Sequence, residues 1–318
     1  MFGYKDLKHQ IGVTTEVECP VNGCSNRVRK QHKVFRAEPP FQCPEHKIYI
    51  SQSTFRYSRD LDNILWKNEE DQKFLEQIKG SKRESRMAHD NSEDALTWNV
   101  FRYLEANSLL SRLLSSLADQ DQGQAELIYW SYSQSERDVW QELQKARNEF
   151  GESRQRSSEP DLIAVTSQAL FFLEAKLQST NSTRPSDPKN RKKYLTGGQE
   201  WFKQVFASDF DTVAIQAQKY ELLRFWLLGT WIASQMERDF YLINIAPSKK
   251  EMDIEQRFRP HLHEAENRRF KRLTWEEIYK LSAQEAPTGP EKEQWLSYFA
   301  NRTVGYNPSH NLRKAFAL

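Results

Sequence analysis

Two short apolar segments near the middle of the chain are separated by a polar break. Leu162–Val165 and Leu170–Leu173 are apolar throughout, and residues 167–168 between them are polar. Apolar runs of this length that flank a polar turn are typical of two antiparallel β-strands. A turn centred on the break pairs Ile163 with Phe172, so the sequence predicts both a hairpin and its register.

The same register brings two acids to one end of the hairpin. It places Asp161 opposite Glu174, and directly opposed side chains on one strand face have Cβ atoms about 4.5–5.5 Å apart. The two-residue period of a strand puts Lys176 on the same face. Two carboxylates at this distance need a compensating cation, and a hard divalent ion bound by both is the natural one. The alternative is a surface hairpin in which Glu174 and Lys176 pair with each other or with solvent, but the apolar opposite face favours burial.

Helical and strand-like patterns around the hairpin predict the rest of an α/β domain. We expect a helix from Ser92 to about Ser116, a strand over Ala125–Ser131, a helix from Asp209 or Asp211 to Ile232, and a strand over Phe240–Ile245. The last strand is expected beside the hairpin. Together these elements predict a mixed central β-sheet flanked by helices, with residues 251–318 as helical cover.

These residues, in this order, resemble a known signature. Pro160-Asp161 followed by Glu174-Ala175-Lys176 is similar to the motif of the PD-(D/E)XK nuclease superfamily, which has a restriction-endonuclease-like core. The resemblance implies that Asp161, Glu174 and the carbonyl of Ala175 hold Mg²⁺ or Mn²⁺, and that Lys176 positions or activates the attacking water. The implied activity is that of a metal-dependent endonuclease that hydrolyses phosphodiester bonds in nucleic acid, with DNA favoured, in host defence or restriction.

Three further residues match positions near the active site in parts of this superfamily. In many members an acid on a helix before the sheet contributes to the metal site, and Glu93 is the matching residue. Gln216 and Tyr220, four residues apart on one expected helix, resemble the Q-x-x-x-Y arrangement of the RecB-like branch. The alternatives are an acid that complements the helix dipole, and a buried tyrosine beside a surface glutamine.

All three cysteines lie within the first 45 residues, which is a poor disulfide framework and a better metal-binding pattern. Cys19 and Cys24 form one close pair of ligands, and Cys43 and His46 form another. Three thiolates and one imidazole are typical of a structural Zn²⁺ site. We therefore expect a module that looks like a zinc ribbon, with its connector, in residues 1–80, and a nuclease-like domain in residues 81–318. The alternative is three reduced cysteines and an exposed histidine.

The chain is almost neutral, with a formal net charge of +2, so attraction to nucleic acid must come from local basic clusters. Two clusters stand out in the second half of the chain: Lys189, Arg191, Lys192 and Lys193, and Arg268, Arg269, Lys271 and Arg272. Both are expected to contact phosphates. The first cluster is expected in a long polar loop after the hairpin, and the alternative for it is a disordered surface insertion without such contacts.

The sequence shows neither the pattern of a secretory signal nor an apolar stretch long enough for a bilayer, which predicts a cytoplasmic protein without a membrane partner. Two rival functions stay open. One is a non-catalytic nucleic-acid-binding protein of the same fold, and the other is a regulatory protein in which the zinc module binds a protein partner. Homo-oligomers are compatible with each of these functions.

Overall fold

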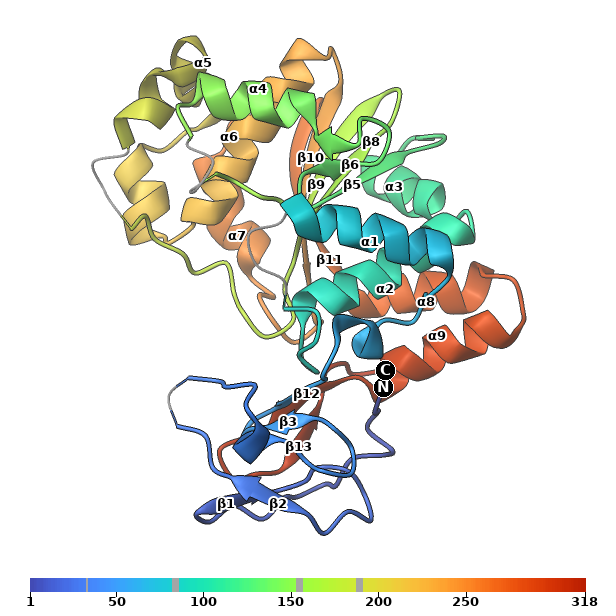
Figure 1. Ribbon diagram of the computed structural model, residues 1–318. Coiled ribbons are helices and arrows are strands. Elements are labelled where there is room, and N and C mark those ends of the chain that lie inside the picture. The colour runs from blue at the N-terminus through green and yellow to red at the C-terminus, as the bar shows by residue number, and fades with distance from the viewer. Residues whose placement is uncertain (33, 82–85, 153–156, 187–190) are drawn as a thin grey trace. The chain divides into compact units, whose positions relative to one another are not determined.

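The computed structural model describes residues 1–32, 34–81, 86–152, 157–186 and 191–318 (Figure 1). The chain divides into two compact units. The first unit consists of Met1–Gln72, Glu84–Asn107 and Trp275–Leu318, and the second consists of Lys73–Arg83 and Ser108–Thr274. The expected domains have a single boundary near residue 80, whereas these units alternate along the chain.

The second unit is built on a seven-stranded mixed sheet whose strands lie in the order β11-β10-β9-β8-β5-β6-β7. In chain order they are β5 (Glu126–Tyr129), β6 (Tyr132–Ser133), β7 (Asp138–Val139), β8 (Leu162–Val165), β9 (Ala169–Ala175), β10 (Asp239–Ala246) and β11 (Arg268–Thr274). β9, β10 and β11 are parallel, and the other neighbours are antiparallel. The predicted mixed sheet is confirmed. The sequence pattern does not predict β11, because four of its seven residues are basic.

The predicted register of the hairpin is confirmed. Ile163 pairs with Phe172, and the alignment continues to Leu242 on β10 and Phe270 on β11. All four side chains are fully buried and form an apolar row on one face of the sheet. The next row on this face is polar and contains Glu174, Asn244 and Arg272.

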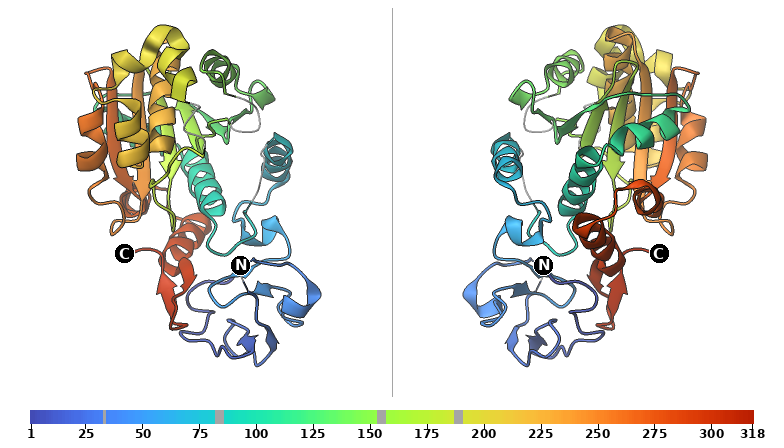
Figure 2. Two further views of the ribbon diagram at one scale, coloured as in Figure 1. Left: turned by 90° about the vertical axis from the view of Figure 1, so that its left-hand side faces the viewer. Right: turned by 90° about the vertical axis from the view of Figure 1, so that its right-hand side faces the viewer.

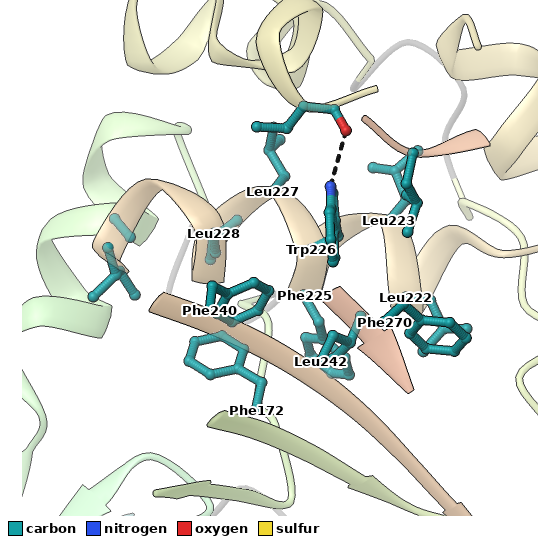
Figure 3. Close-up of a cluster of buried hydrophobic side chains, with 14 of the residues drawn as sticks. Phe172, Leu222, Leu223, Phe225, Trp226, Leu227, Leu228, Phe240, Leu242 and Phe270 are labelled. Atoms are coloured by element: carbon teal, nitrogen blue, oxygen red, sulfur yellow. Dashed lines mark hydrogen bonds between the residues drawn. The ribbon is translucent and has the colours of Figure 1, made fainter. Parts of the chain in front are cut away.

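Three helices cover the face that carries the apolar row. They are α4 (Gln141–Glu149), α5 (Arg191–Val205) and α6 (Tyr220–Gln235), and they share one buried cluster with the sheet. Figure 3 shows Trp226 of α6 in this cluster, where its indole Nε1 donates a hydrogen bond to the carbonyl of Val205 at 2.9 Å. Gly229 allows α6 to approach β10 closely, because a Cβ atom there would lie 2.2 Å from the ring of Phe240.

The opposite face of the sheet contacts α3 (Leu110–Ala118) and α1 (Glu69–Ser81). The hydroxyl of Tyr241 on β10 donates to the carbonyl of Ala118 at 3.4 Å. Phe74 of α1 packs edge to face against Tyr129 of β5, with 5.8 Å between the ring centroids. The sheet is therefore covered on both faces, and Figure 2 gives two further views of it. The remaining helices of this unit are a π-helix over Thr212–Gln216, α7 (Ile254–Phe258) and a 3₁₀-helix over Arg259–His261.

The expected helix from Ser92 to about Ser116 is two helices, α2 (Glu93–Ala106) and α3. Ser92 caps α2 as predicted, because its Oγ accepts a hydrogen bond from the backbone nitrogen of Ala95 at 3.1 Å. The chain leaves the helical conformation after α2, and Ser108 has a positive φ of 57°.

The first unit has a core around its cysteines. Its strands are β1 (Glu16–Glu18), β2 (Arg27–Arg29), β3 (Tyr49–Ile50), β4 (Phe55–Arg56), β12 (Thr303–Tyr306) and β13 (Leu312–Lys314). Its other helices are α8 (Trp275–Glu285), α9 (Pro290–Asn301) and 3₁₀-helices over Pro39–Phe41 and Asp60–Asn63. The expected C-terminal helices are present as α8 and α9. The hairpin of β12 and β13 was not expected, and its Tyr306 and Leu312 pack in the same cluster as the cysteines.

Every helix in the described ranges is too short or too polar to cross a lipid bilayer.

Candidate active site and candidate zinc centre

The structure brings together the two acids and the lysine of the predicted motif. Asp161 directly precedes β8, and its Oδ2 accepts a hydrogen bond from the backbone nitrogen of Ala175 at 2.8 Å. Glu174 and Ala175 are the last residues of β9, and Lys176 follows them. The backbone nitrogen of Lys176 donates to the carbonyl of Ile245 at 2.7 Å, which keeps this segment beside β10.

The charges of this group are buried and interdependent. Glu174 is 4% exposed, and its pKa is raised well above the usual range by burial and by the carboxylate of Asp161. Burial opposes the charge of Lys176, but Glu174, Glu221 and Asp161 together raise the pKa of the lysine, so it carries an ammonium group. Three acids, Asp161, Glu174 and Glu221, thus influence one buried lysine, and acids this close to one another favour the binding of a cation.

One carboxylate oxygen at the site lacks a partner. The Nζ of Lys176 donates to Oε1 of Glu174. The other oxygen of Glu174, Oε2, is buried and accepts no hydrogen bond from any residue that the structure describes. A buried acceptor without a partner is unfavourable, so this oxygen is a natural contact for a cation.

The structure adds Glu221, which the sequence interpretation missed. Glu221 lies in the first turn of α6, and its Oε2 accepts a hydrogen bond from Nζ of Lys176 at 3.0 Å. Its backbone nitrogen donates to Oγ1 of Thr183 at 2.9 Å. An acid in a first helical turn ordinarily complements the helix dipole, so sequence alone gave no reason to connect it with Lys176.

A second polar group extends the site along the sheet. Asn244 aligns with Glu174, and its Oδ1 accepts a hydrogen bond from Nδ2 of Asn181 at 2.6 Å. Nδ2 of Asn181 and Nδ2 of Asn244 also donate to Oε2 of Glu251, at 2.7 and 3.1 Å. Asn181 and Asn244 are fully buried. These contacts fix the segment that follows Lys176 against β10.

The prediction that Gln216 and Tyr220 share one helix face is wrong. Gln216 is exposed and ends the π-helix, Gln218 has a positive φ of 55°, and α6 begins only at Tyr220. The left-handed residue interrupts the helix, so the four-residue spacing no longer places the two side chains together. The hydroxyl of Tyr220 donates to that of Tyr194 at 3.3 Å.

Glu93 belongs to the first unit, whereas the hairpin acids belong to the second. It lies in the first turn of α2, directly after the N-cap Ser92. Its position is the one that the sequence predicts, and its role at the metal site stays a prediction.

The first basic cluster begins a helix. Arg191, Lys192 and Lys193 form the first turn of α5, while Lys189 lies outside the described residues. Arg191 forms an ion pair with Asp211 at 2.5 Å, and Lys192 is exposed. The sequence interpretation placed these residues in a loop.

The second basic cluster is divided between the two faces of β11. Arg269 and Lys271 lie on one face, where Lys271 forms an ion pair with Asp119 at 3.0 Å. Arg268 and Arg272 lie on the other face, and Arg272 donates hydrogen bonds to the carbonyls of residues 247, 248 and 250. The four residues therefore do not form one continuous basic surface.

The four predicted zinc ligands converge in the first unit. One potential ligand atom from each of Cys19, Cys24, Cys43 and His46 lies within 4.8 Å of the others. The Sγ atoms of Cys24 and Cys43 are 3.8 Å apart, and Nδ1 of His46 is 3.7 Å from the Sγ atoms of Cys19 and Cys43. Ligands about 2.3 Å from a tetrahedral Zn²⁺ are about 3.8 Å apart, so the group could bind zinc. Burial raises the pKa of the Cys19 thiol, so its thiolate requires a cation.

Comparison with protein families agrees with the restriction-endonuclease-like interpretation. The family model described as Restriction Endonuclease associating with ARP matches residues 29–302. This range includes the hairpin acids, Lys176 and Glu221, and it begins after the first two cysteines. No curated protein gives a match to the chain. No solved structure matches it. Because the match covers most of the chain, the protein belongs to the Restriction Endonuclease associating with ARP family.

Proposed function

We propose that the protein is a metal-dependent endonuclease that hydrolyses phosphodiester bonds in nucleic acid, with DNA as the favoured substrate. The observation that carries this proposal is the arrangement of Asp161, Glu174 and Lys176 at the end of β9. It combines two neighbouring acids, a buried lysine and an acceptor oxygen without a partner among the described residues. Membership of a restriction-endonuclease family supports the same reaction.

The acids fit a hard divalent cation such as Mg²⁺ or Mn²⁺. Asp161 and Glu174 offer carboxylate oxygens, which these ions prefer, and the carbonyl of Ala175 is proposed as a backbone ligand. Burial, together with the carboxylate of Asp161, raises the pKa of Glu174, and its Oε2 has no hydrogen-bond partner among the described residues, so a cation bound there would stabilise the charged form. When bound, the ion would act as a Lewis acid toward the phosphate and make a water molecule more acidic.

The residues of the chain have distinct tasks in this proposal. Lys176 holds the attacking water by a hydrogen bond and offsets the negative charge that develops on the phosphate oxygens. The water oxygen forms a bond to phosphorus in line with the leaving oxygen, whose own bond to phosphorus breaks; the proton lost by the water passes to solvent, and the leaving oxygen takes a proton from solvent. Asp161 keeps a fixed orientation, because its Oδ2 is bound to the backbone of Ala175.

Contacts to the nucleic-acid backbone are proposed for the basic residues of α5 and β11. Lys192 is exposed on α5, and Arg269 and Lys271 share one face of β11. Arg272 already binds three backbone carbonyls, so its contribution to phosphate binding is expected to be smaller. The preference for DNA and a role in host defence or restriction rest on the family.

One observation favours a second candidate function, a non-catalytic nucleic-acid-binding protein. Lys176 contacts both Glu174 and Glu221, so part of the charge at the site is balanced without a metal ion. A protein of this kind would bind nucleic acid in the presence of a chelator and would release no products. A regulatory protein that uses only its zinc module would bind little nucleic acid even at low salt.

The decisive experiment is a cleavage assay with plasmid, linear DNA, single-stranded DNA and RNA in the presence of Mg²⁺, Mn²⁺ or EDTA. Lys176→Ala is compared with Lys203→Ala, which removes an exposed lysine whose ion pair with Glu200 lies at the surface. We expect ion-dependent cleavage that Lys176→Ala lowers by about 10²-fold or more and Lys203→Ala leaves unchanged. Cleavage that is equal in both variants contradicts the proposed mechanism, and binding without products in any ion supports the second candidate.

A further inference from the structure

Lys176 is held between acids from two different elements. Its Nζ donates to Oε1 of Glu174 on β9 and, at 3.0 Å, to Oε2 of Glu221 on α6. The side chain of Glu174 is 5% exposed, whereas that of Glu221 is 33% exposed. Of these two acids, one is buried and the other is accessible to solvent.

A divalent cation and Lys176 compete for Glu174. The cation and the ammonium group of Lys176 are both positive and repel each other strongly in a buried site. A cation bound to Glu174 therefore weakens the interaction between this carboxylate and Lys176. A buried ammonium group without an acid is unfavourable. Lys176 thus needs another acid whenever Glu174 binds an ion, and Glu221 is already in contact with it.

Glu221 lacks the features of a third metal ligand. In the part of the chain that the structure describes, the cysteine and histidine cluster is the one group of three or more potential ligand side chains close enough to hold an ion. Asp161, Glu174 and Glu221 form no such group. The first turn of α6 is instead fixed by Thr183, whose Oγ1 accepts from the backbone nitrogen of Glu221 and whose backbone pairs with residues 218 and 220. These contacts keep Glu221 at Lys176.

We infer that Glu221 is a positioning residue, which retains Lys176 while Glu174 binds the divalent ion of the proposed active site. The inference rests on the proposed function. Glu221 acts through Lys176: it gives the ammonium group a second partner, so that the ion and the lysine occupy the site at the same time. Without Glu221, the lysine stays on Glu174 and opposes binding of the ion.

A double-mutant cycle on Mn²⁺ binding tests this inference without nucleic acid. Free Mn²⁺ is measured by electron paramagnetic resonance for the wild type, Glu221→Gln, Lys176→Met and the double variant, and Lys176→Gln replaces Lys176→Met if the latter does not fold. We expect Glu221→Gln to weaken Mn²⁺ binding by about tenfold when Lys176 is present and by less than about threefold when it is absent. Glu200→Gln, which removes the acid of an exposed lysine pair, is the matched control and leaves the affinity unchanged.

The outcomes separate the inference from the proposed function. A wild type that binds no Mn²⁺ at the hairpin contradicts the proposed function, and the inference with it. If Glu221→Gln weakens Mn²⁺ binding equally with and without Lys176, Glu221 acts directly on the ion. That result contradicts the inference but not the proposed function. Circular dichroism and thermal unfolding of each variant establish that a change in affinity is not a loss of fold.

Discussion

Asn244 lies beside Glu174 in the parallel register of β10 and β9, so an amide and a carboxylate occupy adjacent positions on one face of the sheet. The apolar row next to them packs under α6, whereas the polar row lies at the end of the strands where the chain turns away. The amide of Asn244 also connects the sheet to Asn181 and Glu251. The position of Glu174 is thus linked to the segment that follows Lys176.

Asn244→Ala is expected to lower cleavage activity without unfolding the protein. The change leaves the buried Nδ2 of Asn181 and the carboxylate of Glu251 each with one hydrogen bond fewer, which costs about 1–3 kcal/mol and loosens the segment after Lys176. Steady-state cleavage and thermal unfolding of the variant measure both effects. Asn148→Ala, which alters an exposed asparagine of α4, is the control. Equal activity in the two variants would show that Asn244 does not help to position the site.

Arg224→Met is expected to destabilise the second unit by about 3–5 kcal/mol, because it leaves a charged carboxylate buried. Nε of Arg224 donates to Oε1 of Glu152 at 3.1 Å, and the side chain of Glu152 is fully buried. Arg191→Met removes one partner of the exposed pair with Asp211 and is expected to cost less than about 1 kcal/mol. Urea unfolding measures both. Similar losses in the two variants would contradict the assignment of Arg224 as the main counter-ion of Glu152.

The same pair predicts a pH dependence of stability. Burial alone would raise the pKa of Glu152, but Arg224 and the hydrogen bonds from Ser158 lower it below its usual value. A carboxyl group that is more acidic in the folded chain makes its full contribution to the free energy of unfolding above its pKa in the unfolded chain, which is about 4.3. This contribution is lost as the pH falls through the lower pKa of the folded chain. The stability difference between the wild type and Glu152→Gln should therefore shrink below about pH 4.3. A difference that stays constant down to about pH 3 would contradict this linkage.

The hairpin and its register could be predicted because a one-residue shift would move every apolar side chain to the other face. The apolar segments on both sides of residues 167–168 are compatible with one strand pairing across the turn, and the structure contains this pairing. The convergence of the four potential zinc ligands could be predicted for a similar reason, because two close pairs of ligands leave little freedom in how four side chains meet.

Glu221 could not be predicted, because its contact with Lys176 joins residues 45 positions apart in the sequence and depends on how α6 packs over the sheet. The interruption at Gln218 was equally hidden, since an ordinary polar residue adopts the left-handed conformation there. The four basic residues of β11 concealed a strand whose Phe270 forms the end of the apolar row. In each case tertiary packing overrides the local pattern.

Gly229→Ala is expected to destabilise the second unit by about 1–3 kcal/mol, although alanine is the better helix former. The added Cβ would lie 2.2 Å from the ring of Phe240, which is itself buried in the cluster between α6 and the sheet. Gly80→Ala in α1 is the matched control, because nothing lies within 4 Å of its Cβ position, and it should be neutral or stabilising by up to about 1 kcal/mol. Thermal unfolding compares them. A Gly229→Ala variant as stable as the wild type would mean that α6 can move away from β10 at little cost.

If the cysteine and histidine cluster binds zinc as we propose, replacement of its fourth ligand, His46, is expected to release the metal and to unfold the cysteine-bearing part of the first unit. His46→Ala leaves three buried thiols, and the small apolar cluster around them, to which Val17, Ile48 and Phe55 belong, is not expected to hold the fold without a metal ion. We expect one zinc ion per chain in the wild type and about none in His46→Ala by elemental analysis, together with faster proteolysis of residues 1–60. His32→Ala removes an exposed histidine of the same unit and should keep its zinc.

Because the proposed active site lies in the second unit, Mn²⁺ binding at the hairpin should survive in His46→Ala. Full zinc content in that variant would contradict the assignment of His46 as a ligand, and loss of Mn²⁺ binding would show that the two units depend on each other.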